Sequence, residues 1–122
     1  MRKFVLYITT VFIAILLCGN GYNKKYIREG QSSNAKILYN IDNDYIREGQ
    51  SVTGYIMYNL DKRGDITYIR KGQSKCGEIL YNIVDKRIRK GQSRYGVIVY
   101  TIDGQYIREG QSPTGTIRYN ID

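Results

Sequence analysis

Five arginines hold the same position in a heptapeptide that occurs five times in the chain, and guanidinium groups at a repeated position could bind anions. The heptapeptide reads YIREGQS from residues 26, 45 and 106, YIRKGQS from 68 and RIRKGQS from 87. The arginines are Arg28, Arg47, Arg70, Arg89 and Arg108. A ring of five such charges about 10 Å apart would cost about 4 kcal/mol in water-like surroundings. The arginines are therefore expected to point apart into solvent, to meet an anion, or to stack on the tyrosine two residues earlier, which is present at Tyr26, Tyr45, Tyr68 and Tyr106.

A glutamine and a serine follow each arginine and could hydrogen-bond sugar hydroxyls. The glutamines are Gln31, Gln50, Gln73, Gln92 and Gln111. Five polar loops on one rim, close to aromatic rings, would suit multivalent binding of a carbohydrate. The structural alternative is that serine caps a turn while glutamine bonds the backbone of a neighbouring hairpin. The five arginines and five glutamines are the candidate ligand-binding residues.

The sequence offers little for catalysis, a cofactor or a metal ion. Histidine is absent, which removes nucleophile–histidine pairs and most zinc sites. The residue after the repeated arginine is glutamate in three copies but lysine at Lys71 and Lys90. A pair of catalytic carboxylates therefore cannot operate in every copy. Cys76 stands at a variable position between two glycines, which indicates a loop residue, and we expect a protein that is not an enzyme.

The first 21 residues predict export. Two basic residues precede an apolar run over 4–17, which is shorter than the roughly 20 residues that a membrane-spanning helix needs. Such a run is typical of a signal peptide, here 1–21, with small residues before Tyr22 and a domain over 22–122. The alternative is a lipoprotein signal that ends before Cys18, although a large leucine precedes that cysteine. We expect a periplasmic, secreted or envelope-associated protein whose only membrane contact would be a lipid on Cys18.

The domain consists almost entirely of repeats. The units are 26–44, 45–67, 68–86, 87–105 and 106–122. Each holds two short β-prone runs separated by Gly-Gln-Ser-x-x-Gly, which predicts a hairpin. Because an open sheet of ten strands would leave two unpaired edges, closure is favoured. We predict an all-β monomer of five two-stranded antiparallel hairpins closed around a pseudo-five-fold axis, like a flower, propeller or barrel.

A three-residue hairpin loop ending on the second glycine sets the predicted register. It requires positive φ at that glycine, which would strain Ala35 in the first unit. The loop pairs Arg28 with Asn40, Ile27 with Ile41 and Glu29 with Tyr39. Side-chain alternation then places the isoleucines at 27, 37 and 41 on one core face. The same face carries Tyr39, Tyr58, Tyr81, Tyr100 and Tyr119, which we expect to pack in the core.

The second unit carries a link that is four residues longer, over 61–67, where the repeat is expected to be least regular. It includes Arg63-Gly64-Asp65, a tripeptide that resembles an integrin-binding motif and that arises readily by chance.

The formal net charge of the chain is +8. This balance favours an anionic partner such as an acidic glycan or another envelope component. Nucleic acid is not an expected partner of an exported protein.

The repeated YIREGQS-xx-G-x-ILYNID unit, five times behind a signal peptide, resembles the bacterial five-fold beta-flower proteins. The resemblance extends over residues 26–122. It implies an exported protein built from five β units, without established catalytic residues. Arg87, Thr101 and Ala35 depart from the repeated pattern, which puts strict symmetry in doubt. On these grounds we expect a non-catalytic binding module for an anionic or carbohydrate envelope ligand, the alternative being a structural or protein-interaction component of the envelope.

Overall fold

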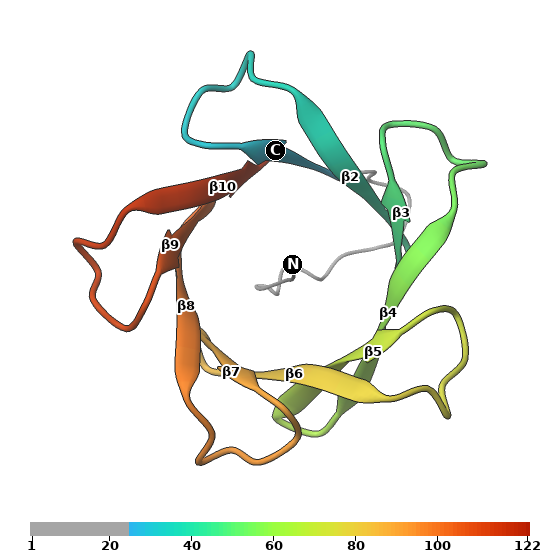
Figure 1. The fold of residues 1–122 in the computed structure, drawn as a ribbon, viewed down its shortest axis with the longest axis vertical. Helices are drawn as coiled ribbons and strands as arrows, with labels where there is room; N and C mark the ends of the chain where they lie inside the picture. Colours follow the sequence, from blue (N-terminus) through green and yellow to red (C-terminus); the bar gives the residue numbers. More distant parts are fainter. Residues whose placement is uncertain (1–24) are drawn as a thin grey trace.

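Ten antiparallel strands form a closed barrel in the computed structural model, which describes residues 25–122 (Figure 1). The strands are β1 (Lys25–Glu29), β2 (Ile37–Asp42), β3 (Tyr45–Glu48), β4 (Ile56–Arg63), β5 (Ile66–Lys71), β6 (Ile79–Val84), β7 (Arg87–Lys90), β8 (Ile98–Asp103), β9 (Tyr106–Glu109) and β10 (Ile117–Ile121). Neighbours in the chain pair with each other, and β1 also pairs with β10. The predicted closed all-β architecture is confirmed. The expected signal peptide and Cys18 lie outside the described residues.

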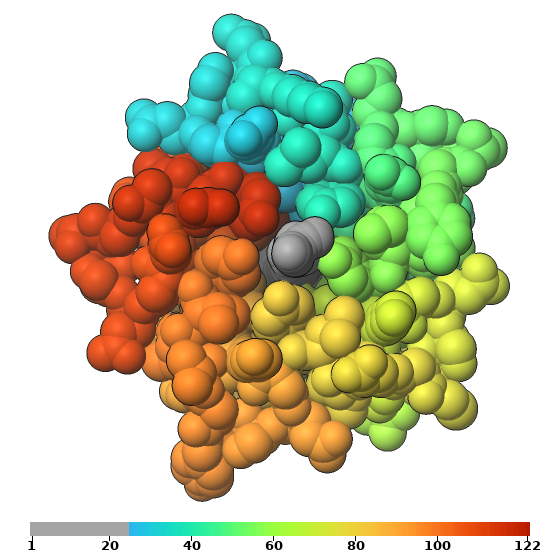
Figure 2. All heavy atoms as spheres, viewed as in Figure 1, coloured from blue at the N-terminus to red at the C-terminus, as the bar shows by residue number. Residues whose placement is uncertain are grey.

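Long loops and short turns alternate around the barrel. The loops that follow β1, β3, β5, β7 and β9 project outward and form the corners of the molecule (Figure 1, Figure 2). The other strand connections have two residues, such as Asn43-Asp44 between β2 and β3. Asn43 and Asp85 start two of these turns with φ of 60° and 58°, a conformation that asparagine and aspartate tolerate better than most residues. Tight turns at these links are therefore confirmed. Within 25–122, no helix is both long enough and apolar enough to cross a membrane.

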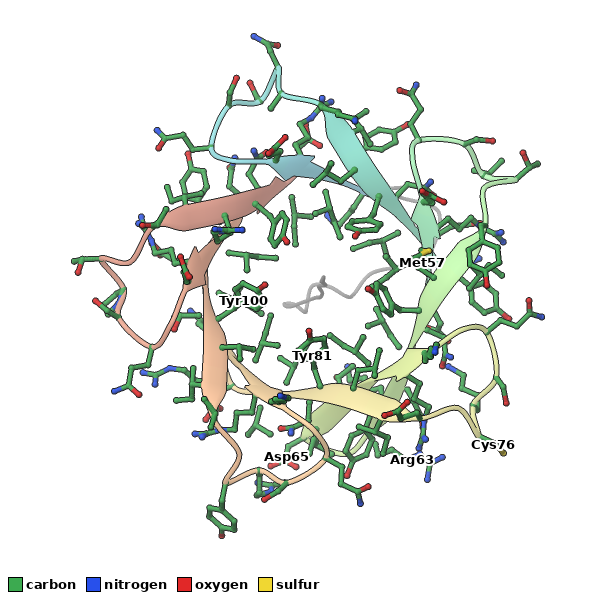
Figure 3. All side chains as sticks on the ribbon, in the orientation of Figure 1. Met57, Arg63, Asp65, Cys76, Tyr81 and Tyr100 are labelled. Carbon is green, nitrogen blue, oxygen red and sulfur yellow. The ribbon has the colours of Figure 1, made fainter. Side chains whose placement is uncertain are left out.

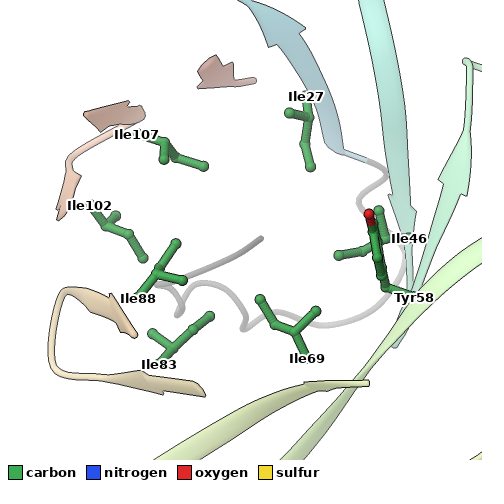
Figure 4. Packing of buried hydrophobic residues seen from close by; sticks show 8 residues of the cluster. All are labelled: Ile27, Ile46, Tyr58, Ile69, Ile83, Ile88, Ile102 and Ile107. Carbon is green, nitrogen blue, oxygen red and sulfur yellow. The ribbon is translucent and has the colours of Figure 1, made fainter. Parts of the chain in front are cut away.

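The isoleucine of each heptapeptide fills the barrel interior. Ile27, Ile46, Ile69, Ile88 and Ile107 are at most 2% exposed. Tyr81 and Tyr100 also point inward, from β6 and β8 (Figure 3). Tyr58, Ile83 and Ile102 complete the buried cluster (Figure 4). Because burying one such side chain contributes about 1.5–3 kcal/mol, this inward row is the main apolar support of the fold.

The register within each long hairpin differs from the prediction. Ile27 lies opposite Tyr39, not Ile41, and Arg28 lies opposite Ile37, not Asn40. The predicted kinds of pair occur instead between successive units, where Asn40 faces Arg47, Ile41 faces Ile46 and Tyr39 faces Glu48. The cause is the loop, which spans the seven residues from 30 to 36 rather than three. The main-chain N–H of Glu29 closes it by donating to the Lys36 carbonyl, at 3.1 Å.

A register shift in every long hairpin removes one predicted residue from the core face. The shift lies between Ile27 and Arg28 in the first hairpin, and the other four hairpins have equivalent shifts. It places Ile37 opposite the outward Arg28, so the prediction of Ile37 on the core face is wrong. In the second, third and fourth hairpins, the residue that follows the equivalent of Ile37 packs against the core instead. These residues are Met57, Leu80 and Val99. A β-bulge bends the strand at this point, which is consistent with the outward course of the loops.

The prediction of positive φ at the second glycine of each loop is wrong. Positive φ belongs to the first glycine of each loop, for example +75° at Gly72. The second glycine is needed for a close approach: a Cβ atom on Gly77 would lie 2.5 Å from the carbonyl oxygen of Lys71. Ala35 takes this place in the first loop, where the closing hydrogen bond is 3.1 Å long against 2.8–2.9 Å in the other four. Ala35 is therefore accommodated by a slightly wider loop rather than by left-handed backbone.

The longer link of the second unit is not a loop but an extension of two strands. β4 and β5 each continue for two more residues, which adds the pairs Lys62–Thr67 and Arg63–Ile66. The turn is reduced to Gly64-Asp65, and Gly64 has a φ of 62°. Ile66 is buried, but it shares the outer strand face with Tyr68 and Arg70 and lies opposite Val84, so the extension adds an apolar pair outside the core cluster.

Replacing Gly77 with alanine is expected to destabilise the fold by about 1–3 kcal/mol, because the new methyl group would collide with a main-chain oxygen that cannot move freely. The matched control is Ala35→Gly, which removes a methyl group at the equivalent position and is expected to leave the free energy of unfolding within about 0.5 kcal/mol. Urea unfolding followed by circular dichroism measures both. Equal effects of the two substitutions would contradict the close-approach explanation.

Candidate functional site

Each repeated arginine first binds the loop of its own hairpin. One Nη donates to the main-chain carbonyl seven residues later. The distances are 2.8 Å for Arg28–Ala35, 3.0 Å for Arg47–Gly54, 2.7 Å for Arg70–Gly77, 2.8 Å for Arg89–Gly96 and 2.9 Å for Arg108–Gly115. This bond fixes the outer end of the loop against the strand that leads into it.

Four of the five arginines also meet a carboxylate from the preceding strand. The Nε–carboxylate distances are 3.1 Å for Arg28–Asp122, 3.6 Å for Arg47–Asp42, 3.0 Å for Arg70–Asp61 and 2.9 Å for Arg108–Asp103. The same four stack on the tyrosine two residues earlier, with the guanidinium carbon 5.5–5.9 Å from the ring centroid. The predicted stacking is confirmed for these four. They lie on the outer face, opposite the buried isoleucines, and binding of an external anion by them stays a prediction.

A buried amide, which the sequence reasoning did not single out, joins each unit to the next. The side-chain amides of Asn40, Asn59, Asn82 and Asn120 are 0% exposed. Each donates to two main-chain carbonyls of the following loop, as Asn82 does to Gly91 and Ser93 at 2.9 Å. In the remaining unit Thr101 Oγ1 donates to the Gly110 carbonyl at 2.8 Å. The signal in the sequence was an uncharged side-chain donor, asparagine or threonine, that recurs between a tyrosine and an aliphatic residue in the second run of each unit.

The serines and glutamines of the loops differ in role. Each serine Oγ accepts a hydrogen bond from the main-chain N–H two residues later, for example from Tyr95 to Ser93 at 3.0 Å. Serine capping of the turn is therefore confirmed. All five glutamines are exposed, and among residues 25–122 their side chains make no hydrogen bond. Their side-chain amides are available to a ligand, and ligand binding by them stays a prediction.

The hairpin of β7 and β8 departs from this pattern at two places. Val84 stands where the other units have the aspartate partner of the arginine, and Arg87 stands where they have the stacking tyrosine. Among the described residues, Arg89 consequently has neither a carboxylate nor a ring partner, and its hydrogen bond to Gly96 is its one polar contact. Arg87 has no hydrogen bond or ion pair within the same part of the chain.

The inward tyrosines pack in the core, as predicted, and not on a binding surface. Tyr39 and Tyr58 meet edge to face with ring centroids 6.3 Å apart, and Tyr100 and Tyr119 do so at 6.0 Å. Burial raises the pKa of the Tyr119 phenol, as do the charge of Tyr100 and the hydrogen bond to it. Burial likewise raises the pKa of Tyr100. Both phenols are therefore neutral at physiological pH and serve packing.

The remaining candidate residues are accounted for by local contacts. Arg63 Nε bonds Asp61 at 3.1 Å, and Asp65 accepts from Arg94 at 2.9 Å, so both charges of the Arg63-Gly64-Asp65 tripeptide are engaged within the molecule. Cys76 is a free, exposed cysteine at the outer edge of its loop (Figure 3). Within 25–122, no group of three or more acidic, histidine or cysteine side chains could hold a metal ion.

The sequence was compared with models of known protein families. A family described as 6-fold beta flower protein matches residues 27–122. The chain belongs to this beta-flower family. The expected resemblance was to a five-fold family, whereas the matched description is six-fold, so the match supports the beta-flower family and differs in the repeat count that the description names. No curated protein and no solved structure matches the chain. The beta-flower assignment identifies the fold and carries no activity.

Replacing Asn82 with alanine is expected to destabilise the beta-flower fold by about 2 kcal/mol, because two loop carbonyls lose their donor in a buried place. Asn82→Thr is the matched control, since threonine supplies one donor at the equivalent position of the next unit. Its cost is expected to be less than half as large. Urea unfolding measures both, and equal losses would show that the amide does not hold the loop.

Asp61 is expected to make stability depend on pH. Partial burial would raise the pKa of its carboxyl, but hydrogen bonds and charge from Arg63 and Arg70 outweigh burial and hold the pKa below its usual 3.8. The stabilisation is therefore present above pH 3.8 and is lost as the pH falls through the lower folded-state pKa. Asp61→Asn is expected to cost about 2 kcal/mol at pH 7 and progressively less as the pH falls below 3.8.

The control for this pH dependence is Asp44→Asn, which removes the exposed ion pair to Lys75 at 3.5 Å. An exposed pair contributes about 0–1 kcal/mol, so this variant is expected to follow the unchanged protein at every pH. Urea unfolding at several pH values provides the comparison. A loss at Asp61→Asn that stays constant with pH would contradict the ion-pair origin.

Proposed function

We propose that this beta-flower protein is an exported, non-catalytic binding module for an anionic or carbohydrate component of the cell envelope. The observation that supports it is the contrast within each heptapeptide loop. Arginine, serine and the first glycine are occupied by bonds that shape the loop, whereas glutamine is exposed and unbonded within the described chain. A loop that is rigid before binding loses less conformational entropy when a ligand is bound.

The proposal includes the symmetry of the barrel, which we take to consist of five pseudo-equivalent hairpins around a common axis. The equivalent arginine–carbonyl bonds, amide–carbonyl bonds and register shifts in the five hairpins support it. Such an arrangement would present five similar loops around the rim. A ligand with repeated units, such as a polysaccharide, gains affinity from several weak contacts that act together.

Glycan-array binding at about 150 mM salt tests the proposal, since non-specific attraction between exposed charges is largely screened there. The protein is expected to bind at least one envelope-type glycan saturably. A variant with alanine at all five loop glutamines is expected to lose at least about tenfold in affinity. Its unfolding midpoint should not change, because those side chains hold nothing in the fold.

Gln105 provides the control, as it is an exposed glutamine on the two-residue turn between β8 and β9 rather than on a long loop. Gln105→Ala is expected to leave glycan binding intact, to be compared with the single variant Gln92→Ala. If no glycan or other envelope polymer binds saturably, the protein is a structural or protein-interaction component of the envelope and the binding proposal fails.

A further inference from the structure

One hairpin of the barrel carries an arginine whose internal carboxylate is missing. The aspartates at the equivalent place in the other four units lie 2.9–3.6 Å from their arginine Nε. Val84 pairs with Arg87 across the strands as Asp42 pairs with Tyr45, so valine occupies the aspartate position. Arg89 Nε therefore faces a side chain that cannot accept a hydrogen bond.

A second guanidinium stands next to the first. Arg87 and Arg89 are two residues apart on β7 and share the outer face, which places their Cα atoms about 7 Å apart. Their cross-strand neighbours are all uncharged: Val84 and Thr101 beside Arg87, and Asn82 and Ile98 beside Arg89. Lys90 also lies on β7, and the turn before this strand carries Asp85 and Lys86. Arg94 in the loop after β7 is already paired with Asp65 at 2.9 Å.

Both arginines are half-buried, as are the four that hold an aspartate. A planar carboxylate fits a guanidinium through two parallel hydrogen bonds. The aspartates of the other units demonstrate that a carboxylate fits against this strand. An internal aspartate acts at high effective concentration and competes with any ligand, so the β7 hairpin is the one repeat in 25–122 that is open to an external carboxylate.

We propose that Arg87 and Arg89 bind the carboxylate of an acidic saccharide, in the place that aspartate occupies in the other units. The saccharide part of this inference rests on the proposed function. It is supported by Tyr95, which is 89% exposed and precedes the glycine whose carbonyl Arg89 binds. An exposed aromatic ring beside a cationic site can stack on the apolar face of a sugar.

The test is to supply the missing carboxylate from the protein itself. The probe is a galacturonic acid tetramer, titrated by calorimetry at about 150 mM salt, with the Arg87 and Arg89 Nε–H signals followed by NMR. Val84→Asp is expected to pair with Arg89, to retain or raise the unfolding midpoint, and to weaken tetramer binding at least about tenfold. Arg87→Gln, which adds no new group, is expected to weaken binding in the same direction.

The matched control is Val52→Asp, which makes the same substitution at an exposed valine in the loop between β3 and β4. It lowers the net charge equally and is expected to change the affinity less than about threefold. The inference is overturned if Val52→Asp and Val84→Asp weaken binding equally, if the tetramer does not bind saturably, or if a glutamate peptide of the same charge binds more tightly. If the tetramer does not bind while a neutral glycan binds saturably and loses its affinity in the variant with five loop alanines, this site is overturned and the proposed function stays intact.

Discussion

Barrel closure is the constraint on which the rest of the structure depends, because both edges of every strand are paired only if the last strand meets the first. The pair of β1 and β10 that closes the barrel makes the same kinds of contact as the other pairs of strands that join successive units. Tyr26 and Asp122 exchange two main-chain hydrogen bonds of 2.9 and 3.0 Å, and Asp122 also receives the Arg28 guanidinium. Asn120 reaches across the same joint to the carbonyls of Gly30 and Ser32. A repeated sequence makes closure straightforward, since each unit is already complementary to a neighbour like itself.

The faces of the first strand of each hairpin were predictable from the sequence, whereas the register of the strands was not. Alternation in Tyr-Ile-Arg sends isoleucine inward and the other two outward, and this follows from strand geometry alone. Register depends on the number of loop residues and on bulges, and Ser-x-x-Gly suggested a shorter loop than the one that forms. Ile37 was misplaced for this reason, because Ile-Leu-Tyr is apolar at consecutive positions and its alternation can be read in either phase.

The sequence predicted those contacts of the candidate site that lie within one strand, but not those that depend on strand register. The stacking of arginine on tyrosine is a contact within one strand, and local spacing is sufficient to predict it. The ion pairs and the buried asparagines join different strands or units, so they depend on the register that the sequence left open. Asn40 lies opposite the outward Arg47, yet the loop that follows covers Asn40 completely, and the same holds for its equivalents. Their burial is a property of the assembled barrel and not of any single unit.

Repetition also separates what the fold requires from what it does not. Within the heptapeptide, isoleucine fills the core, arginine and serine shape the loop, and the first glycine supplies left-handed backbone. Glutamine alone among the invariant residues has no such role in the described chain, although it is present in all five copies. The exceptions carry complementary information: Thr101 preserves a donor where asparagine is missing, whereas Val84 replaces a carboxylate with no substitute. A change that keeps the contact is compatible with a purely structural role. Val84 removes the contact but gains an apolar cross-strand partner in Ile66, so packing accounts for the valine and leaves the added positive charge of Arg87 without a structural explanation.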